Sequence, residues 1–597
     1  MRYLIILFLL LSINTYAQKE DYIWPLGSNG GGTKAQLLLD TTKRFWPFNL
    51  NFNNDPMTLE YRIDRKMNAR NTISSISYQD GELFAYSHGR AVWDGNDDFI
   101  ASGDTINYDE AWEFWNLSPN TNFGFKTPQG MIMLPYPDRD SLVFWIVSQS
   151  NFDRNTSEGF YWGTIAGYDG QSPTKVVEKD NFVQTGDLKF GMVKANRHAN
   201  GRDWWLLMIS DDNTTIYTYL LDPDGLSLID RQNRGRLNTG FTSGNAVFSA
   251  DGSKYAVIDG GYYTLRGWIS VFDFNRCTGR LSNAHHKFIR INQYSIGQSV
   301  VFSPNGKYLY ANTDSILYQI DLSSSDYPMT ELATYDGFQS FPDPSGLNQT
   351  VFGYWAEGPD GRHYNVSGAG TALHMHIMDY PNEGGEAASF RQHALRTPNN
   401  PWSIPNFPNY RLGPLDGSTC DTLGLDNHPI AKYRYESADT IDFRHIRFTD
   451  LSYFRPTRWV WDFGDGMGQL EAQSPYHRYV RNGTYNVCLT VSNEYSSNTT
   501  CRLITLGMTT TTQDTRPTAD ISIFPNPATD YFNLTLGDYV PARGTFTLYA
   551  LSGVVVHTQR VYYGQNAVDV TDLPTGMYVY RLTDEGQVIG EGKVVLR

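Results

Sequence analysis

The sequence predicts an all-β protein, and three observations support this. Aromatic residues make up 14% of the 597 residues, and the chain holds 53 glycines. Apolar residues alternate with a period of two, and no long stretch keeps a helical spacing. Four turn glycines, Gly201, Gly252, Gly306 and Gly361, recur at steps of 51, 54 and 55 residues. A period of this size in an all-β chain indicates propeller blades, an array of hairpins or separate small domains.

The clearest copy of the repeat is residues 299–310 (SVVFSPNGKYLY). Apolar residues alternate on both sides of Asn305–Gly306, which is the pattern of two half-buried strands. Asn-Gly supplies the positive φ angles that a short hairpin turn needs. Residues 245–256 are a close copy, and residues 356–364 and 194–205 are looser ones.

A single four-stranded sheet cannot bury both of its faces, so repeated sheets pack around a channel and close into a ring. We therefore expect residues 18–415 to form a β-propeller with seven blades, or six as the alternative. Its strands begin at residues 73–78, with a turn at Asp80–Gly81, and continue to residues 373–378. The competing explanation is that turn-rich strands often carry Asn-Gly or Asp-Gly without forming a ring.

The first seventeen residues have the pattern of a secretory signal peptide. A positive start is followed by an apolar run from Leu4 to Ile13 and by Ala17 at the expected cleavage site. No later run is long and apolar enough to span a bilayer, so we expect a mature chain without a transmembrane segment. The net charge of −15 argues against nucleic acid and against an anionic membrane surface as partners.

An exported chain can form disulfides, and this one has four cysteines. Cys488 and Cys501 each lie five residues from the turn Asn493–Ser496, so a hairpin would place them opposite each other. We expect a cross-strand disulfide between them. Cys277 and Cys420 could pair or stay free, and the sequence does not decide between these options.

Residues 425–506 are expected to form a small antiparallel sandwich. Trp459 and Trp461 alternate on one strand before the turn Gly464–Gly466, and residues 483–491 alternate as another strand. The core Trp-Asp-Phe-Gly-Asp-Gly, with a downstream Pro-Tyr-His-Arg-Tyr, resembles a PKD domain. The resemblance implies an immunoglobulin-like extracellular module that spaces other domains or contacts polysaccharide.

Residues 507–519 are rich in threonine and form a predicted linker to a last domain, residues 520–597. This domain opens with Pro-Asn-Pro-Ala and ends with Gly-Lys-Val-Val, and its alternating strands predict a second sandwich. These motifs resemble the type A sorting domain of the type IX secretion system. The resemblance implies export through that machinery, with release or attachment at the outer-membrane surface. The residues that match the family pattern are Pro525, Asn526, Pro527, Gly576, Tyr578 and Lys593.

The first region also resembles secreted propeller proteins of the Bacteroidetes. The stretches that carry this resemblance are residues 77–89, 129–137 and 404–413. In that group a WD40-like propeller region is followed by a PKD domain and a sorting domain. The resemblance supports the ring and implies no particular chemistry.

Two pairs of residues could hold a metal ion. His374 and His376 alternate on a predicted strand, so both imidazoles face the same side and could bind zinc if a third ligand arrives. The alternative is an exposed or channel-facing strand edge. Asp462 and Asp465 could bind calcium, but Asx hydrogen bonds that stabilise the turn are the favoured explanation.

Five tryptophans are candidates for stacking on a ligand, because flat aromatic rings suit sugar faces. They are Trp112, Trp115, Trp204, Trp205 and Trp402. The alternative is that propeller cores are simply rich in aromatic residues.

No nucleophile elbow, activated cysteine or other catalytic motif is found. We therefore expect a secreted or surface-attached adhesion protein without catalytic residues or a cofactor. Its propeller would bind a glycan or protein, and its PKD domain would act as a spacer. The alternative is an extracellular hydrolase with its active site in the propeller channel, and a third possibility is a purely structural surface protein.

Overall fold

The structure is a computed structural model, and it describes most of the chain outside the N-terminus, the interdomain linker and several loops. The described residues are 18–27, 46–65, 67–68, 72–108, 112–113, 124–125, 127–150, 157–170, 172–188, 192–210, 212, 214–233, 245–260, 266–291, 298–340, 348–368, 371–401, 403–439, 442–506, 521–536, 539, 541, 544–550, 555–561, 565–584 and 587–597. The predicted signal peptide, residues 1–17, and the predicted linker lie outside them.

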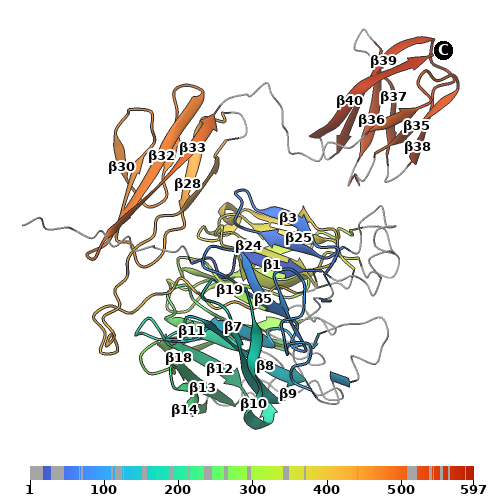
Figure 1. Ribbon diagram of the computed structural model, residues 1–597. Helices are drawn as coiled ribbons and strands as arrows, with labels where there is room; N and C mark the ends of the chain where they lie inside the picture. Colours follow the sequence, from blue (N-terminus) through green and yellow to red (C-terminus); the bar gives the residue numbers. More distant parts are fainter. Residues whose placement is uncertain are drawn as a thin grey trace, which may run out of the picture. The chain divides into compact units, whose positions relative to one another are not determined.

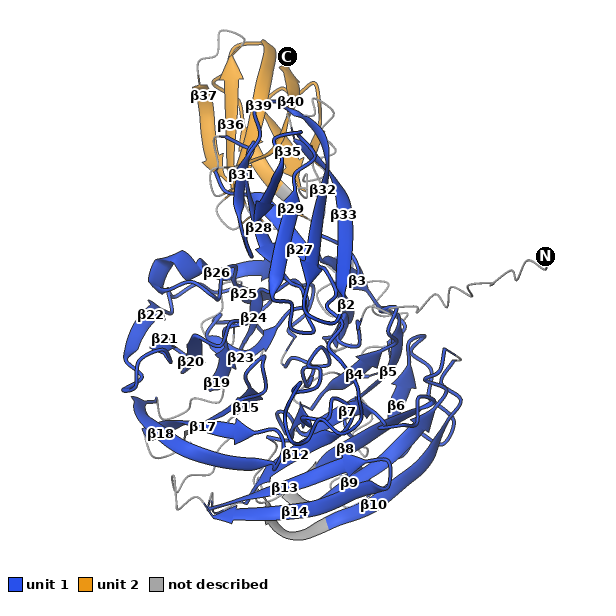
Figure 2. Cartoon of the chain, turned by 90° about the vertical axis from the view of Figure 1, so that its left-hand side faces the viewer, with its two compact units in different colours: residues 1–39, 43–506 blue, residues 40–42, 507–597 orange. Residues whose placement is uncertain are grey.

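The chain forms two compact units, shown in different colours in Figure 2. The first comprises residues 1–39 and 43–506, and the second comprises residues 40–42 and 507–597. In both units the named elements are strands, apart from one short 3-10 helix, η1 (Gly385–Ala388). Among the described residues, no helix is both long and apolar enough to cross a membrane.

The larger part of the first unit consists of seven small antiparallel sheets, which we number in chain order (Figure 1). Their strands are β1–β3 (Ile23–Leu26, Phe48–Asn51, Thr58–Tyr61), β4–β6 (Ser74–Ser77, Leu83–Ser87, Val92–Asp94), β7–β10 (Met131–Pro135, Leu142–Ser150, Ser157–Ala166, Lys175–Leu188), β11–β14 (Lys194–Arg197, Trp204–Ile209, Thr215–Asp222, Gly225–Asn233), β15–β18 (Asn245–Phe248, Lys254–Gly260, Arg266–Asn275, Arg280–Arg290), β19–β22 (Ser299–Phe302, Tyr308–Asn312, Ile316–Asp321, Met329–Thr334) and β23–β26 (Phe352–Glu357, His363–Ser367, His374–Met378, Phe390–Arg396). Within each sheet, strands that follow one another in sequence are hydrogen-bonded neighbours.

The four turn glycines of the repeat occupy equivalent positions in sheets four to seven. Gly201, Gly252, Gly306 and Gly361 each follow the first strand of a sheet and have φ angles of 79°, 70°, 68° and 74°. Each donates its N–H to the carbonyl oxygen three residues earlier, at 2.8–3.0 Å. The sequence repeat therefore reflects one type of hairpin that occurs in each of these four sheets. Each copy has a glycine with a positive φ angle at the same turn position.

Each sheet packs on the next, and the last packs on the first. First strands contact each other between sheets one and two, two and three, four and five, five and six, and six and seven. One buried cluster joins sheets three and four through residues such as Phe144 and Trp204. Another joins sheet seven to sheet one, where Trp24 and Leu50 pack with Val366. The core is thus a closed series of sheet-to-sheet contacts.

The structure departs from the predicted strands mainly at the outer edges of the sheets. The long outer strands β10, β14 and β18 lie where the sequence predicted no strand. These outer strands are mostly exposed and polar, as the pattern of β18 shows. The apolar alternation that marks half-buried strands is therefore missing from them.

The rest of the first unit is a two-sheet sandwich, called here the first sandwich. One sheet has the order β27-β28-β31 and the other β30-β29-β32-β33. Their bounds are β27 (Tyr433–Ser437), β28 (His445–Asp450), β29 (Arg458–Asp462), β30 (Gln469–Glu471), β31 (Tyr476–Arg478), β32 (Gly483–Ser492) and β33 (Ser497–Leu506). The buried Trp461 packs between the sheets with Phe448, Val487 and Leu489.

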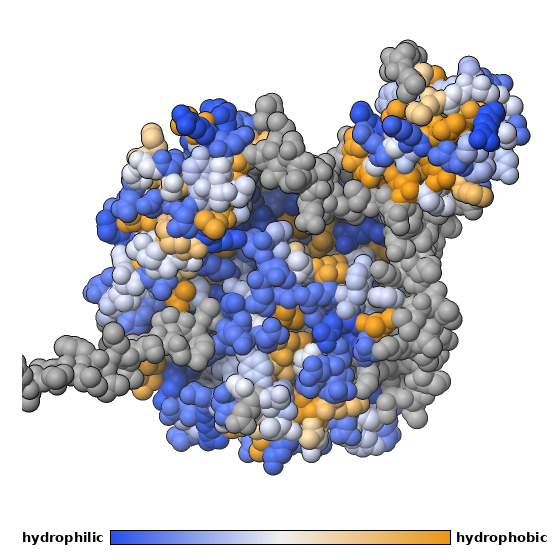
Figure 3. Space-filling view, turned by 45° about the horizontal axis from the view of Figure 1, so that its top comes forward, coloured by the Kyte–Doolittle hydropathy of each residue, from blue (hydrophilic) through white to orange (hydrophobic). Residues whose placement is uncertain are grey.

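The second unit is a separate sandwich with its own core. One sheet has the order β34-β35-β38 and the other β37-β36-β39-β40. The bounds are β34 (Ser522–Phe524), β35 (Tyr531–Thr535), β36 (Thr545–Ala550), β37 (Val555–Arg560), β38 (Gln565–Asp569), β39 (Gly576–Asp584) and β40 (Gln587–Leu596). Phe532, Phe546 and Leu582 are fully buried in it. Figure 3 shows apolar side chains gathered on the visible face of this unit.

Candidate functional site

A cavity of about 800 Å³ lies in the first unit. Its walls come from the first strands of sheets four to seven and their turns, from residues 403–415, and from residues 449–459 of the first sandwich. We call it the main cavity. Because the sheets and the first sandwich both supply walls, its shape depends on how the sandwich is held against the sheets.

Residues 403–415 form one wall of the main cavity and bind several sheets together. The side-chain amide of Asn406 donates to the carbonyl oxygens of Met131 at 3.0 Å and Val193 at 2.9 Å. Asn409 donates to the backbone of the turn in sheet five at 2.7 Å. These bonds satisfy backbone groups that would otherwise be buried without partners. The segment therefore fixes the relative positions of sheets three, four and five at the cavity.

Most charged side chains of the main cavity already have partners. Arg411 donates to the carboxylate of Asp21. Asp251 accepts hydrogen bonds from hydroxyl and N–H groups of its own turn. Arg276 donates to three backbone carbonyl oxygens. Asp450 accepts from an indole and an amide side chain of the first sandwich. These groups are therefore engaged in holding the protein together.

Two other charged residues face the main cavity without a counter-ion among the described residues. Lys194 is only 8% exposed, and its ammonium group donates to the carbonyl oxygen of Phe407 at 3.0 Å. Burial lowers the pKa of Lys194 to about 7. Glu357 ends β23 with its side chain open to cavity water but surrounded by protein, and this desolvation raises its pKa to about 7. Lys194 thus loses much of its hydration, whereas Glu357 stays exposed to the cavity, and neither group forms an ion pair with a described residue.

A loop of the first sandwich brings a third charge to the cavity. Phe454 and Arg455 both line it, and both have positive φ angles, 61° and 52°. Such angles cost a non-glycine residue of order 1–3 kcal/mol, and they occur where surrounding structure enforces them. Arg455 is exposed, so water screens its charge more than that of Lys194.

Amide and aromatic side chains supply much of the remaining lining. Examples are Asn245, Asn382, Phe248, Tyr354 and Trp459. No histidine lines the cavity in the part of the chain that the structure describes. Amides can hydrogen-bond hydroxyl or peptide groups, and aromatic rings can stack on flat apolar faces. Such side chains can contact a bound ligand.

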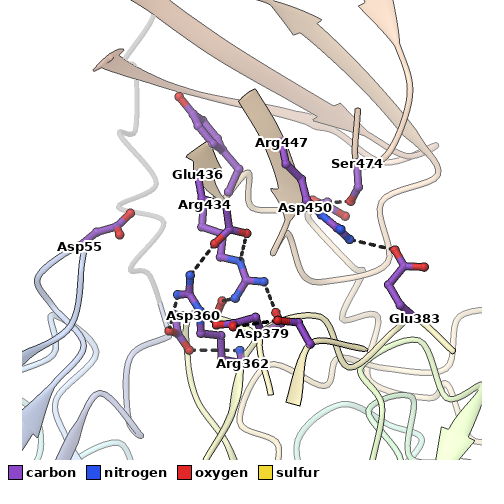
Figure 4. A network of polar contacts seen from close by, with 12 residues as sticks. Asp55, Asp360, Arg362, Asp379, Glu383, Arg434, Glu436, Arg447, Asp450 and Ser474 are labelled. Carbon is purple, nitrogen blue, oxygen red and sulfur yellow. Dashed lines mark hydrogen bonds and ion pairs between the residues drawn. The ribbon is translucent and has the colours of Figure 1, made fainter. Parts of the chain in front are cut away.

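An ion-pair network holds the first sandwich against sheet seven (Figure 4). Arg362 contacts the carboxylates of Asp360 at 3.0 Å, Asp379 at 3.0 Å and Glu436 at 2.6 Å. Glu436 belongs to β27, and the other three residues belong to sheet seven and its turns. Arg434 of β27 is 3% exposed and donates to the backbone carbonyl oxygens of Asp360 and Asp379. The buried charges are therefore compensated across the junction.

Further contacts extend this junction on both sides of the network. Arg447 of β28 pairs with Glu383 at 2.8 Å, and its guanidinium lies 3.7 Å from the ring centroid of Tyr380. Lys432 donates to the hydroxyl of Tyr22 and to a backbone carbonyl oxygen of sheet seven's first turn. The first sandwich is thus docked on the seven sheets and lines the main cavity, and the spacer role that its family resemblance implies stays a prediction.

The three candidate tryptophans that the structure describes do not form a common surface. Trp204 and Trp205 are 0% and 2% exposed, so their rings belong to the core and are not available to a ligand in this structure. Trp112 is half-buried, and its indole N–H donates to a backbone carbonyl oxygen at 3.2 Å. Trp115 and Trp402 lie outside the described residues. The aromatic rings of the cavity come from other positions.

His374 and His376 lie on β25 and are both buried. Nδ1 of His374 is 2.9 Å from the hydroxyl of Ser340, and Nδ1 of His376 accepts from the backbone N–H of His393 at 3.0 Å. Burial lowers the pKa of both histidines to about 3. No group of three metal-ligating side chains occurs in the described ranges. The zinc site therefore stays a prediction without a third ligand.

The two aspartates considered for calcium form hydrogen bonds within their turn. Asp462 accepts from the N–H of Gly464 at 2.9 Å, and Asp465 accepts from the N–H of Met467 at 3.1 Å. Asp465 also lies 2.7 Å from Nε2 of His477. This is the Asx-turn arrangement that the sequence favoured over calcium.

Both pairs of cysteines are joined in the structure. Cys488 and Cys501 lie opposite each other on β32 and β33 and form a disulfide with an S–S distance of 2.05 Å. This is the pairing that the hairpin register predicts. Cys277 and Cys420, whose pairing the sequence left open, form the second disulfide. It ties a turn of sheet five to the chain that follows residues 403–415.

The residues that match the sorting pattern meet at the edge of the second unit. The side chain of Asn526 accepts from the N–H of Val595 at 2.9 Å and donates to the carbonyl oxygen of Lys593 at 3.2 Å. Tyr578 is buried and donates from its hydroxyl to Pro574 at 2.6 Å. The Asn526 side chain thus hydrogen-bonds the backbone of β40 as a neighbouring strand would. Lys593 itself is exposed.

The charges of the main cavity were not predicted from the sequence. Lys194 and Glu357 fall within two of the looser repeat copies, Lys194 at the start of the first strand and Glu357 just before the hairpin turn. The closer copies carry Asn245 and Ser299 where the loosest copy has Lys194. A comparison of the repeats, position by position, could have marked these charges as departures from the pattern.

Two parts of the chain match known protein families. Residues 428–506, the first sandwich, match the PKD domain, and residues 522–597 match a secretion system C-terminal sorting domain. The sorting domain indicates a protein that is secreted or attached to the outer-membrane surface. It also implies interaction with the type IX secretion machinery, a system from which we infer an origin in the Bacteroidetes.

No curated protein matches the chain over its sequence. Among solved structures, the PKD1 domain of Vibrio anguillarum Epp is 25% identical and covers 14% of this chain and 95% of its own, with a TM-score of 0.12. A periplasmic gluconolactonase of Pseudomonas aeruginosa is 14% identical and covers 72% and 99%, with a TM-score of 0.30. A putative 6-phosphogluconolactonase of Bacteroides uniformis is 12% identical and covers 72% and 100%, with a TM-score of 0.29. These scores are too low to support a functional comparison.

Proposed function

We propose that this is an exported binding protein whose seven sheets form a seven-bladed β-propeller and whose main cavity holds an extracellular ligand. In this proposal residues 1–17 are a signal peptide, residues 18–415 are the propeller and residues 507–519 are the linker to the sorting domain. The PKD domain completes the binding site. The ligand is a segment of extracellular glycan or protein.

The closed series of sheet contacts supports the propeller. Seven sheets follow one another in the chain, first strands contact first strands, and sheet seven packs on sheet one. A blade cannot bury both faces alone, so a closed series is the arrangement that leaves no sheet face without a partner. The seven-bladed form therefore fits better than six blades.

The lining of the main cavity is the observation that carries the binding role. Its amide and aromatic side chains can contact hydroxyl, amide and flat apolar groups. Three of its four carboxylates, those of Asp21, Asp251 and Asp450, are already held by hydrogen bonds. Glycoside cleavage uses two available carboxylates on opposite sides of the bond. Glu357 alone does not meet that requirement, which favours binding over the hydrolase alternative.

Glycan and peptide arrays probed with residues 18–597 test this proposal. We expect a defined subset of spots to bind, and Ala250→Trp, which fills the cavity from the turn of sheet five, to weaken binding by about tenfold or more. Ala284→Trp on the exposed face of β18 is the matched control and should leave affinity within about twofold. Equal binding by both variants, or no binding to any spot, would contradict the proposal.

A further inference from the structure

Two opposite charges without counter-ions stand on different walls of the main cavity. Lys194 lies on β11 in sheet four, and Glu357 ends β23 in sheet seven. Both line the cavity, and two sheets separate them along the chain. Lys194 is buried and loses hydration without gaining an ion pair, and Glu357 is exposed to the cavity without one. A ligand that carries both opposite charges would therefore pair with both residues.

Of the other charges of the cavity, Arg411 is near enough to Glu357 to oppose the rise in its pKa, although its ion pair is with Asp21. Asp21 and Arg411 pair with each other, and Asp251 and Arg276 are held by their own local hydrogen bonds. Asp450 is engaged by side chains of the PKD domain. Arg455 is the remaining cation, but it is exposed on the rim loop, whereas Lys194 is 8% exposed. A buried cation gains more from an anionic ligand than an exposed one.

We propose that the ligand of the main cavity is zwitterionic, with a carboxylate that Lys194 binds and an ammonium group that Glu357 binds. This inference rests on the proposed binding function. The aromatic and amide side chains between the two charges contact the uncharged body of the ligand. A peptide and an amino-sugar acid both carry this pair of charges, and the probes described next distinguish them.

Two matched sets of probes test the charge requirement on residues 18–597 by calorimetry. The peptide set is triglycine, N-acetyl-triglycine, triglycine amide and the doubly blocked form. The sugar set is glucosaminuronic acid, glucuronic acid, glucosamine and glucose. In one of the sets we expect the zwitterion to bind at least about tenfold more tightly than its singly charged and neutral relatives. The set in which the zwitterion binds more tightly identifies the ligand as a peptide or as an amino-sugar acid.

Substitutions test which residue binds each charge of the ligand. Lys194→Met and Glu357→Gln should each weaken zwitterion binding by about tenfold and leave the neutral probe unchanged. Lys307→Gln on the surface is the control, for which we expect a change within about twofold, and Arg455→Gln in the same cavity is the comparison for Lys194→Met. A larger loss with Arg455→Gln than with Lys194→Met would overturn the assignment of Lys194.

The number of protons taken up or released on binding is a second measurement. It would not change in the variants if Lys194 and Glu357 acted only through packing. Near pH 7 both groups are about half protonated, because burial shifts the pKa of each to about 7. A bound zwitterion makes Lys194 take up a proton and Glu357 release one, so the wild type exchanges nearly none. Lys194→Met should show net release, and Glu357→Gln should show net uptake, in buffers of different ionisation enthalpy.

The outcomes separate the two proposals. If a neutral or singly charged probe binds as tightly as the zwitterion, the charge inference is wrong and the binding function stands. If every probe and every array spot fails to bind, the binding function itself fails. Unchanged proton exchange in both variants would also overturn the inference, even if the zwitterion binds.

Discussion

Several ionisable side chains of the first unit are buried at a cost that other contacts must offset. Glu20 is the clearest case, because it is 3% exposed and its Oε2 has no hydrogen-bond partner. Burial raises the pKa of Glu20 from 4.5 to about 7. The Glu20 side chain lies near arginines that contact or belong to residues 403–415. Its protonation therefore affects how that segment is held.

The stability of the protein should depend on the protonation of Glu20. An acid whose pKa is higher when folded binds more protons in the folded state, so its contribution is full below about pH 4.5 and is lost as the pH rises through 7. The total is about 3 kcal/mol. We expect Glu20→Gln to flatten the fall in unfolding free energy between pH 5 and pH 7.5, measured by urea titration. An unchanged slope would contradict this prediction.

The docking of the PKD domain should depend on Arg434. Arg434→Met removes a buried guanidinium, leaves two carbonyl oxygens without their donor and takes one of two arginines from Glu436, so we expect a loss of about 3 kcal/mol in unfolding free energy. Arg458→Met breaks an ion pair whose members are 58% and 61% exposed and should cost less than about 1 kcal/mol. Equal losses in denaturant titrations of the two variants would show that the junction is not held as described.

Single residues were the hardest level to predict from the sequence. The tryptophans were chosen for their chemistry, yet Trp204 and Trp205 lie in the core because β12 is buried on both faces. Lys194 and Glu357 belong to no recognisable sequence motif. They line the same cavity only because sheets four and seven both contribute to its walls. Asn305–Gly306, in contrast, was correctly placed in a turn by local backbone chemistry.

At the scale of elements, the repeated hairpin is the feature that the sequence predicts best. Its glycines, its alternating apolar residues and its spacing all act locally, so a strand–turn–strand unit could be recognised without knowing its neighbours. The outer strands were missed because their exposed polar residues resemble a loop. The number of sheets depended on contacts between distant segments and was left between six and seven.

The turn glycines differ in what surrounds them, and this gives a matched test. A methyl group at Gly252 would lie 2.6 Å from Leu412 and 2.7 Å from Asn196, whereas one at Gly306 would have nothing within 4 Å. Both glycines have positive φ, so Gly306→Ala should cost about 1 kcal/mol from backbone strain alone. Gly252→Ala should cost about 2 kcal/mol more, because it also displaces residues 403–415. Thermal or urea unfolding of the two variants measures the difference, and equal costs would contradict the role given to that segment.

At the scale of the whole molecule, the sequence predicted the two sandwiches and their order, and both match the families that their motifs resemble. It did not predict that the PKD domain docks on the sheets, since the network around Arg362 joins residues that are more than seventy positions apart in the chain. Such contacts leave no local pattern.

This docking predicts how truncated chains bind. Residues 18–506 should bind ligand as tightly as residues 18–597, because the main cavity lies entirely in the first unit. Residues 18–424 lack the walls from residues 449–459 and should bind at least about tenfold more weakly. Titration calorimetry compares the three chains, with circular dichroism to check that each is folded. Equal affinity of the shortest chain would mean that the PKD domain takes no part in the site.

The central claim is that ligand is held in the main cavity, between the sheets and the PKD domain. Hydrogen exchange with and without the tightest ligand from the arrays tests it most directly. We expect slower exchange at residues 245–251, 352–358, 403–415 and 449–456, and no change in the second unit. Protection confined to the outer strands β10, β14 and β18, with none at these four segments, would contradict the account.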